Sequence, residues 1–184
     1  MCGIVGIIST KNVTSSILNS LRKLEYRGYD SAGIATLESR IIKEVKCEGR
    51  VDALESNLTK QNLEGNVGIG HVRWATHGVP STINAHPHSS DKVSVVHNGI
   101  IENSTILKKL LVKKGYTFKS QTDTEVIVHL ITDYLKKNDL KNSIIKMLKR
   151  IHGSFALGII FQDQPDLIVG ARRGSPLAVG YGPN

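Results

Sequence analysis

Predicted strands in this chain follow one another in groups and do not alternate one by one with helices, and this order restricts the fold more than any other feature. Short apolar runs predict strands at residues 4–8, 33–37, 41–47, 67–72, 93–96, 154–161, 167–171 and 177–179. Apolar residues at helical spacing predict helices at residues 12–24, 104–114, 124–137 and 141–151. Consecutive strands favour antiparallel sheets with helices packed outside them over a doubly wound parallel sheet. We therefore expect an α+β fold.

The chain has 184 residues, which is the size of one domain with a substantial core. Its 40% apolar and 22% charged residues are typical of a globular protein. No stretch is long or apolar enough to span a bilayer, and the apolar start at residues 4–8 is too short for a signal peptide. We expect a cytoplasmic protein with no membrane partner, whose two cysteines, Cys2 and Cys47, stay reduced.

The net charge of +8 could indicate a nucleic-acid or anion partner. The lysines, however, lie mostly in two predicted helical stretches, 108–114 and 136–149, where Leu and Ile recur at helical spacing between them. This pattern is typical of solvated helix faces. Aromatic residues make up only 5% of the chain and do not interleave with the lysines as a base-stacking surface requires. We expect no nucleic-acid partner.

Cys2 is the residue with the clearest chemical potential. Once Met1 is removed, as a small second residue permits, Cys2 presents a thiol and a free α-amine together. A thiol with a pKa of about 8.5 is a poor nucleophile until it loses its proton, whereas an α-amine with a pKa of about 7.7–8.0 is a usable base near neutral pH. An N-terminal cysteine therefore carries its own base, as N-terminal threonine nucleophiles do. The alternative is a buried structural cysteine, which is how we interpret Cys47.

The sequence Val-His-Asn-Gly at residues 96–99 ends a predicted strand. Asn-Gly commonly marks a simple turn, because both residues tolerate positive φ. The functional alternative is an oxyanion hole, in which the Asn98 amide and the Gly99 backbone N–H aim at one point.

The segment Gly-His-Val-Arg-Trp-Ala-Thr-His-Gly at residues 70–78 begins as a strand and breaks into polar residues. Arg73 could clamp a carboxylate with two hydrogen bonds, or it could pair with an acidic neighbour at the surface. Trp74 is either a core aromatic or part of a functional loop.

The segment Gln-Thr-Asp-Thr-Glu at residues 121–125 precedes a predicted helix. Either Thr122 or Asp123 could cap that helix, and an acidic residue there also suits the helix dipole. Asp123 could in addition bind a cationic ammonium group.

Five of the seven histidines fall between His71 and His97, so a zinc site has to be considered. No HExxH motif or paired CxxC motif accompanies them, and Pro87 constrains the approach of its two neighbours, His86 and His88. We expect no metal and no cofactor.

Taken together, these segments resemble the class II glutamine amidotransferases, which are N-terminal nucleophile hydrolases. The opening Met1–Gly6 is similar to several members of that group. The glucosamine-6-phosphate synthase branch is indicated by six further segments: Leu24–Gly33, Arg73–Gly78, Asn84–His88, His97–Asn103, Thr122–Glu125 and Gly174–Leu177. The related purine-synthesis enzyme is expected to carry Gln-Asp after Arg-Gly and Tyr-Ser in place of Trp-Ala.

The resemblance implies a four-layer αββα sandwich. It implies that Cys2 attacks the side-chain amide of glutamine and forms a thioester, with its α-amine as base and then as acid. Asn98 and Gly99 stabilise the oxyanion in this family.

The same resemblance implies that Arg73 binds the α-carboxylate of glutamine and that Asp123 binds its α-ammonium group. Thr76 and His77 lie around this pocket. Two residues are implied near the ammonia exit, namely Trp74 and Arg27.

The resemblance covers residues 1–184 as one glutaminase domain, which we expect to be incomplete at its C-terminal end. It implies L-glutamine as the substrate. Conversion of fructose 6-phosphate to glucosamine 6-phosphate is implied only through two sugar-isomerase-type domains absent from this sequence, in a full-length homo-oligomer. The alternatives are another class II amidotransferase, an amide hydrolase with a Cys–His pair, and a basic nucleic-acid-binding module.

Overall fold

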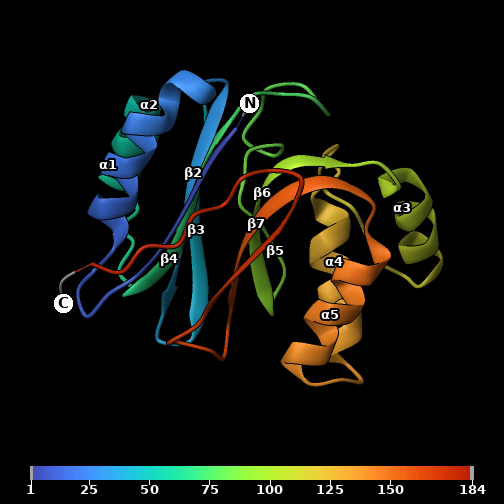
Figure 1. Ribbon diagram of the computed structural model, residues 1–184. Coiled ribbons are helices and arrows are strands. Elements are labelled where there is room, and N and C mark those ends of the chain that lie inside the picture. Colours follow the sequence, from blue (N-terminus) through green and yellow to red (C-terminus); the bar gives the residue numbers. More distant parts are fainter. Residues whose placement is uncertain (1, 183–184) are drawn as a thin grey trace.

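A computed structural model describes residues 2–182, so Met1, whose removal the sequence analysis expects, lies outside the described residues. The chain forms two four-stranded sheets that stack face to face, with helices on the outer side of each (Figure 1). All strand pairs are antiparallel. The α+β class and the four-layer αββα sandwich expected from the sequence are confirmed.

The first sheet has the strand order β1-β4-β2-β3. Its strands are β1 (Gly3–Ile8), β2 (Ser31–Glu38), β3 (Ile41–Glu48) and β4 (Val67–Arg73). Its outer face is covered by α1 (Thr14–Leu24) and α2 (Val51–Leu58), and a 3₁₀ turn, Glu25–Arg27, follows α1. The second sheet has the order β5-β6-β7-β8. Its strands are β5 (His88–Ser89), β6 (Val93–Ile101), β7 (Gly153–Phe161) and β8 (Ile168–Arg173). The helices α3 (Ser104–Lys113), α4 (Glu125–Leu135) and α5 (Leu140–Arg150) lie on its outer side.

Strand β4 is buried along its whole length because both of its faces are covered. Side chains alternate between the two faces of a strand. Gly68 and Gly70 face α1, where an added Cβ would lie 2.8 Å and 2.4 Å from Ile17. Ile69 faces the second sheet, and the same alternation sends His71 and Arg73 toward that side.

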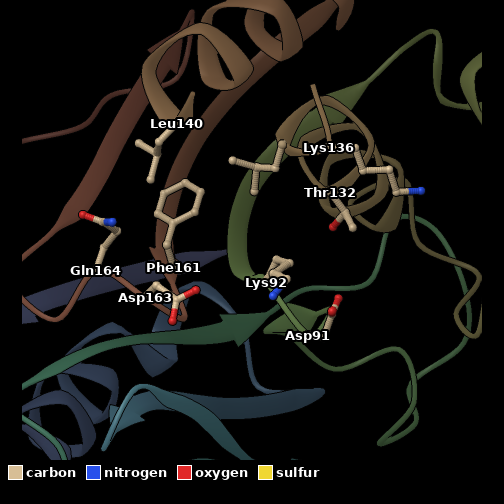
Figure 2. A pocket seen from close by; sticks show the side chains of 9 residues that line it. Asp91, Lys92, Thr132, Lys136, Leu140, Phe161, Asp163 and Gln164 are labelled. Carbon is tan, nitrogen blue, oxygen red and sulfur yellow. The ribbon is translucent and has the colours of Figure 1, made fainter. Parts of the chain in front are cut away.

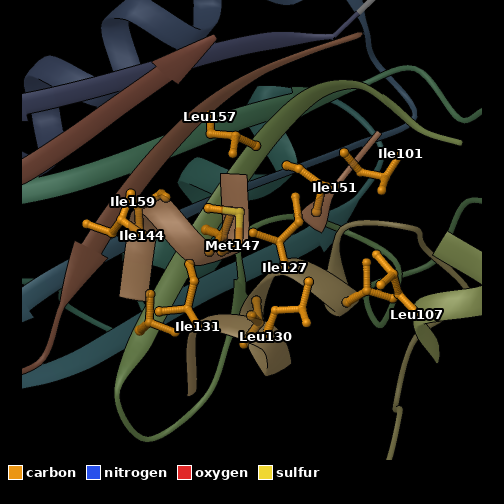
Figure 3. Packing of buried hydrophobic residues seen from close by; sticks show 14 of the residues in the cluster. Ile101, Leu107, Ile127, Leu130, Ile131, Ile144, Met147, Ile151, Leu157 and Ile159 are labelled. Atoms are coloured by element: carbon orange, nitrogen blue, oxygen red, sulfur yellow. The ribbon is translucent and has the colours of Figure 1, made fainter. Parts of the chain in front are cut away.

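The largest apolar core lies between the second sheet and its helices, where Ile127, Ile131 and Met147 pack against Leu157 (Figure 3). A second core joins α1 and α2 to the first sheet. The cluster between the two sheets is the smallest of the three. Polar side chains therefore enter the layer between the sheets.

Most predicted elements are confirmed, with ends shifted by a few residues. Three differences stand out. Helix α2 had no predicted counterpart; it is short and buries only Val51 and Leu54. The predicted strand at residues 177–179 is wrong, because that stretch is irregular and largely exposed. Strand β5 is a two-residue pairing that only the neighbouring β6 creates.

The interpretation of Asn98-Gly99 as a turn is wrong. Strand β6 continues through both residues, and Asn98 pairs with Ala156 while Gly99 pairs with Phe155. Gly99 has φ +145°, a conformation that residues with a side chain rarely adopt. The glycine is required because β7 passes so close that an added Cβ would lie 2.0 Å from the Ser154 carbonyl oxygen.

Replacing Gly99 with alanine should destabilise the fold. The methyl group would collide with the β7 backbone and impose a strained φ, so we expect the free energy of unfolding to fall by at least about 2 kcal/mol. Urea denaturation measures this change. Gly180→Ala is the matched control, because a Cβ there has no neighbour within 4 Å. Equal stability of the two variants would contradict the close packing of β6 on β7.

Candidate functional site

Cys2 lies at the start of β1, and its place follows from strand pairing. Gly3 pairs with Val72 of β4, so Cys2 comes beside the end of β4. The backbone N–H of Trp74 donates to the Cys2 Sγ at 3.4 Å. Burial raises the pKa of the Cys2 thiol, and the Trp74 N–H and the nearby Arg73 cation counteract part of that rise. The thiol therefore needs a base to become a nucleophile.

Arg27 and Trp74 both contact Cys2. The Nε of Arg27 donates to the Cys2 carbonyl at 3.2 Å. The indole of Trp74 is 48% exposed and meets the ring of Tyr29 edge to face at 5.5 Å, so it is not a core aromatic. Gly28 permits this arrangement, since a Cβ there would lie 2.5 Å from the backbone of Arg73.

Arg73 is buried, so it is not the surface ion-pair residue that the sequence allowed. Its guanidinium donates to the carbonyls of His77, Gly78 and Val79. Asp30 lies 3.6 Å away, and its carboxylate also accepts the N–H of Ala75. The three carbonyl bonds leave the Nε–H and one Nη1–H of Arg73 for another acceptor.

The other expected binding residues divide into exposed and buried. Thr76 and His77 lie on the exposed loop after β4. Asp123 is buried, and its Oδ2 accepts the N–H of Ile101 at 2.7 Å. That bond leaves Oδ1 for a cation. The prediction that Thr122 or Asp123 caps the next helix is wrong: α4 begins at Glu125, and Asp123 instead holds the end of β6.

Most of the expected residues line one small cavity of about 20 Å³. Its lining includes Cys2, Arg73, Trp74, Thr76, His77, Gly99 and Asp123. Asn98 and Arg27 are not among the lining residues, although each adjoins one that is. Within residues 2–182 the Asn98 side chain makes no hydrogen bond, so its amide is free to donate. A volume of this size holds about one water molecule.

Four further lining residues were not assigned to the site from the sequence: His86, His97, Thr122 and Thr124. His97, Thr122 and Thr124 are next to a residue that was assigned, whereas His86 lies in the Asn84–His88 segment, which supplied no assigned residue. Thr124 Oγ1 bridges His86 Nε2 at 2.7 Å and His97 Nδ1 at 2.9 Å. One hydroxyl hydrogen cannot serve two acceptors, so at least one of the two ring nitrogens must donate to Thr124 Oγ1.

His71, His86, His88 and His97 form one buried group behind the cavity. The rings of His71 and His86 stack with centroids 4.2 Å apart. Burial lowers the pKa of His71 and of His88 to about 3, so these rings are neutral at ordinary pH. Burial also lowers the pKa of His86 and His97.

A hydrogen-bond chain with a fixed direction runs from this group to Glu125. Ser120 Oγ donates to the Glu125 carboxylate at 2.7 Å, so it accepts from Thr122 Oγ1 at 2.9 Å. Thr122 Oγ1 then accepts from His88 Nε2 at 2.9 Å. A carboxylate only accepts, which makes His88 the Nε2–H tautomer.

No group of three or more His, Cys, Asp or Glu side chains within residues 2–182 is arranged to hold a metal ion.

A larger cavity, of about 550 Å³, lies at the opposite end of β6 (Figure 2). Leu140 and Phe161 lie on its apolar side, and Lys92, Lys136 and Asp163 are among its polar residues. It contains none of the residues expected to be functional. Within residues 2–182 no helix is long and apolar enough to cross a membrane.

The geometry can be compared with known proteins. Residues 71–181 match the family model of the glutamine amidotransferase domain, which is more than half of the chain. The chain belongs to the glutamine amidotransferase family.

Curated relatives of this amidotransferase chain bear the name glutamine–fructose-6-phosphate aminotransferase (isomerizing). The protein of Mesorhizobium japonicum is 54% identical over 184 residues, and that of Clostridium tetani is 50% identical over 184 residues. Each alignment covers 99% of this chain and 30% of the relative. The chain thus spans about a third of the length of the curated relatives it matches.

Solved structures agree with this family. Glutamine phosphoribosylpyrophosphate amidotransferase from B. subtilis, complexed with ADP and GMP, aligns with a TM-score of 0.76 and 28% identity, over 88% of this chain and 35% of that one. A structure described as the allosteric regulatory enzyme of purine biosynthesis aligns with a TM-score of 0.78 and 28% identity, over 88% and 36%.

Acid should destabilise this amidotransferase domain in a pH range set by its buried histidines. Burial holds the pKa of His71 and His88 at about 3 when folded, against an ordinary value of 6.5, so the unfolded chain binds more protons between these values. Stability is therefore full above about pH 6.5 and falls toward pH 3, by up to about 1.4 kcal/mol per pH unit for each histidine. Glu125 adds to the loss below its ordinary 4.5. Burial alone would raise its pKa, but His129, Lys119 and Ser120 hold it at about 2.

Urea midpoints between pH 7.5 and pH 5 measure this effect. His152→Gln is the control, because the His152 side chain is exposed to water in both states and its loss should leave the pH profile unchanged. A stability that does not change between pH 7 and pH 5 would show that the buried rings are not kept neutral.

Proposed function

We propose that this chain hydrolyses L-glutamine to glutamate and ammonia through a thioester on Cys2. The observation that carries the proposal is the convergence of Cys2, Arg73, Gly99 and Asp123 on one cavity, although they span residues 2 to 123. The Cys2 nucleophile and the Gly99 N–H match the side-chain amide of free glutamine. The Arg73 cation matches its α-carboxylate, and the Asp123 carboxylate matches its α-ammonium group.

The reaction begins when the Cys2 thiol gives its proton to the α-amine of the same residue and Sγ attacks the side-chain amide carbon. The amide oxygen becomes an oxyanion, which the Asn98 amide and the Gly99 N–H are proposed to stabilise. The protonated amine then gives its proton to the departing nitrogen, so ammonia leaves and the thioester remains. Water, deprotonated by the amine, attacks the thioester, and glutamate and the free thiol are regenerated.

The α-amine is the base that the surroundings of Cys2 favour. In residues 2–182 the hydrogen bonds of Sγ go to the Trp74 backbone and none goes to an imidazole ring. An amide hydrolase with a Cys–His pair needs such a ring within hydrogen-bond reach. The α-amine exists only in molecules from which Met1 has been removed, because an amide nitrogen has no usable lone pair.

Arg73 and Asp123 are proposed to bind the two charges of free glutamine. Each keeps hydrogen-bonding capacity that faces the cavity, on the guanidinium and on Oδ1 respectively. The cavity is narrow, and the exposed loop with Thr76 and His77 forms part of its lining, so we propose that this loop moves outward when the substrate enters.

By its similarity to the aminotransferases, we infer that residues 1–184 act as the glutaminase domain of a longer cytoplasmic enzyme. Their name indicates fructose 6-phosphate as the acceptor of the ammonia, which would yield glucosamine 6-phosphate, in a homo-oligomeric enzyme. Trp74 and Arg27, both in contact with Cys2, are the residues proposed to border the ammonia exit. The proposed hydrolysis requires no cofactor.

Cys2→Ala should abolish glutamine hydrolysis, while Cys47→Ser should retain it, because Cys47 is buried among the apolar residues under α1 and α2. Ammonia release is measured on protein whose N-terminal residue is shown to be Cys2 by mass spectrometry. Activity should follow the fraction of chains that lack Met1. Equal losses in the two variants, or full activity in chains that keep Met1, would overturn the proposed mechanism.

Arg73→Ala should raise the KM for glutamine by about 30-fold or more, since loss of one partner of a buried charge pair costs about 2–5 kcal/mol. The glutamine concentration that protects Cys2 from alkylation gives an independent value of the affinity. Arg172→Ala is the control, because Arg172 is exposed on β8. Unchanged protection in Arg73→Ala would exclude the proposed role of Arg73.

A further inference from the structure

The proposed catalytic groups come from two different sheets. Cys2 directly precedes β1 and Arg73 ends β4 of the first sheet, whereas Asn98 and Gly99 belong to β6 of the second. Within residues 2–182 no strand pairing joins the two sheets. The distance between the nucleophile and the oxyanion donors therefore depends on contacts across the layer between the sheets, where an error of about 1 Å can cost about 100-fold in rate.

One buried hydrogen bond crosses that layer at the right place. His71 Nε2 lies 2.9 Å from the carbonyl oxygen of His97, the residue before Asn98. Strand β5 pairs with β6 only as far as Val95, so the edge of β6 beyond Val95 has no strand partner. The His71 ring supplies the donor in place of a strand.

The chemistry of this bond is fixed. A carbonyl oxygen can only accept, so His71 must be the Nε2–H tautomer, and burial lowers the pKa of His71 to about 3, which keeps the ring neutral. His71 is fully buried on β4, and β4 pairs directly with β1, which follows Cys2. The bond therefore connects the strand pair at the nucleophile to the strand with the oxyanion donors.

A second buried side chain connects the two proposed substrate-binding residues by another route. Asn84 Nδ2 donates to the Val79 carbonyl at 2.9 Å, and that carbonyl also accepts from Arg73. The same amide bonds Gln121 twice, from Nδ2 to the side-chain oxygen at 3.0 Å and from the Gln121 N–H to Oδ1 at 2.9 Å. Gln121 is two residues before Asp123. Asn84 thus fixes the Arg73 loop against the Asp123 segment without using β6.

We propose that His71 and Asn84 are positioning residues with separate effects: His71 aligns the oxyanion donors with Cys2, and Asn84 aligns Arg73 with Asp123. The inference rests on the proposed glutaminase function. It assigns His71 to the rate of the chemical step and Asn84 to the affinity for glutamine. A general loss of packing at either position would not divide kcat and KM in this way.

The experiment compares matched variants of the Met1-free chain. His71→Leu removes the donor, and His71→Gln restores an amide N–H at a similar reach. Asn84→Asp keeps the acceptor for the Gln121 N–H and loses the bonds to the Val79 carbonyl and to the Gln121 side-chain oxygen. Ile69→Val is the packing control, because Ile69 is fully buried on the same strand and face as His71 and makes no polar contact with β6.

We expect His71→Leu to lower kcat by about 10- to 100-fold and to change KM by less than about 3-fold. His71→Gln should recover most of kcat. Alkylation of Cys2 by iodoacetamide should proceed at the wild-type rate in both, since that reaction needs no oxyanion donor. Asn84→Asp should raise KM, and the glutamine concentration that half-protects Cys2, by about 10-fold with kcat within about 3-fold. Ile69→Val should lower the melting temperature and leave both constants near wild type.

Equal kcat in His71→Leu and wild type, or equal losses in His71→Leu, His71→Gln and Ile69→Val, would overturn the role of His71. A changed kcat with unchanged KM in Asn84→Asp would overturn the role of Asn84. If the wild-type chain hydrolyses no glutamine, the proposed glutaminase function is overturned, but the hydrogen bond inferred for His71 is not. The tautomer of His71, read from its ¹⁵N chemical shifts, then decides the inference separately: Nε2–H supports the bond to His97, and Nδ1–H excludes it.

Discussion

Strand β4 is buried on both faces, and this constraint places Cys2 and Arg73 at the layer between the two sheets. Toward α1 the strand presents glycines, so helix and strand approach closely. Toward the second sheet it presents Ile69, His71 and Arg73, which brings an imidazole and a cation into the layer between the sheets. At the polar end of that layer, Cys2 from the first sheet and Gly99 from the second line the same cavity.

Burial of so many polar groups is tolerated because nearly all of them have partners. The Arg73 cation is surrounded by the carbonyls of residues 77–79 and by Asp30. The histidines avoid the desolvation cost of a charge by staying neutral. The Thr122 hydroxyl fixes the tautomer of His88, and the Thr124 hydroxyl forms hydrogen bonds with both His86 and His97. The ring atoms His71 Nδ1, His86 Nδ1 and His97 Nε2 remain without a hydrogen-bond partner within the described chain. The same neutrality makes the polar layer sensitive to acid, since protonation of His71 would place a second charge in the layer close to the Arg73 cation.

The contrast between the two cavities shows why size alone does not locate this site. The larger one, of about 550 Å³, has room for a ligand but lacks a nucleophile or a buried charge aimed into it. The smaller one, of about 20 Å³, holds the reactive groups behind a loop whose residues are exposed. The carbonyls of residues 77–79 hold the Arg73 guanidinium beside this cavity, and its Nε–H and one Nη1–H stay available for another acceptor.

The sequence by itself determined the class of the fold and predicted most of the residues that line the small cavity. Grouped strands and apolar periodicity predicted the antiparallel α+β architecture, and residue chemistry singled out Cys2, Arg73, Asp123 and the Asn98-Gly99 pair. It could not determine where β6 ends, because Asn-Gly is a turn signal and only pairing with β7 carries the strand through Gly99. It could not distinguish a helix cap from a strand anchor at Asp123, since both use a carboxylate and the choice depends on the distant N–H of Ile101. The roles inferred for His71 and Asn84 depend on atoms 26 and 37 residues away, so the tertiary structure alone decided them. Local patterns record the preferences of neighbouring residues, whereas hydrogen bonds across the layer between the sheets exist only once the two sheets have stacked.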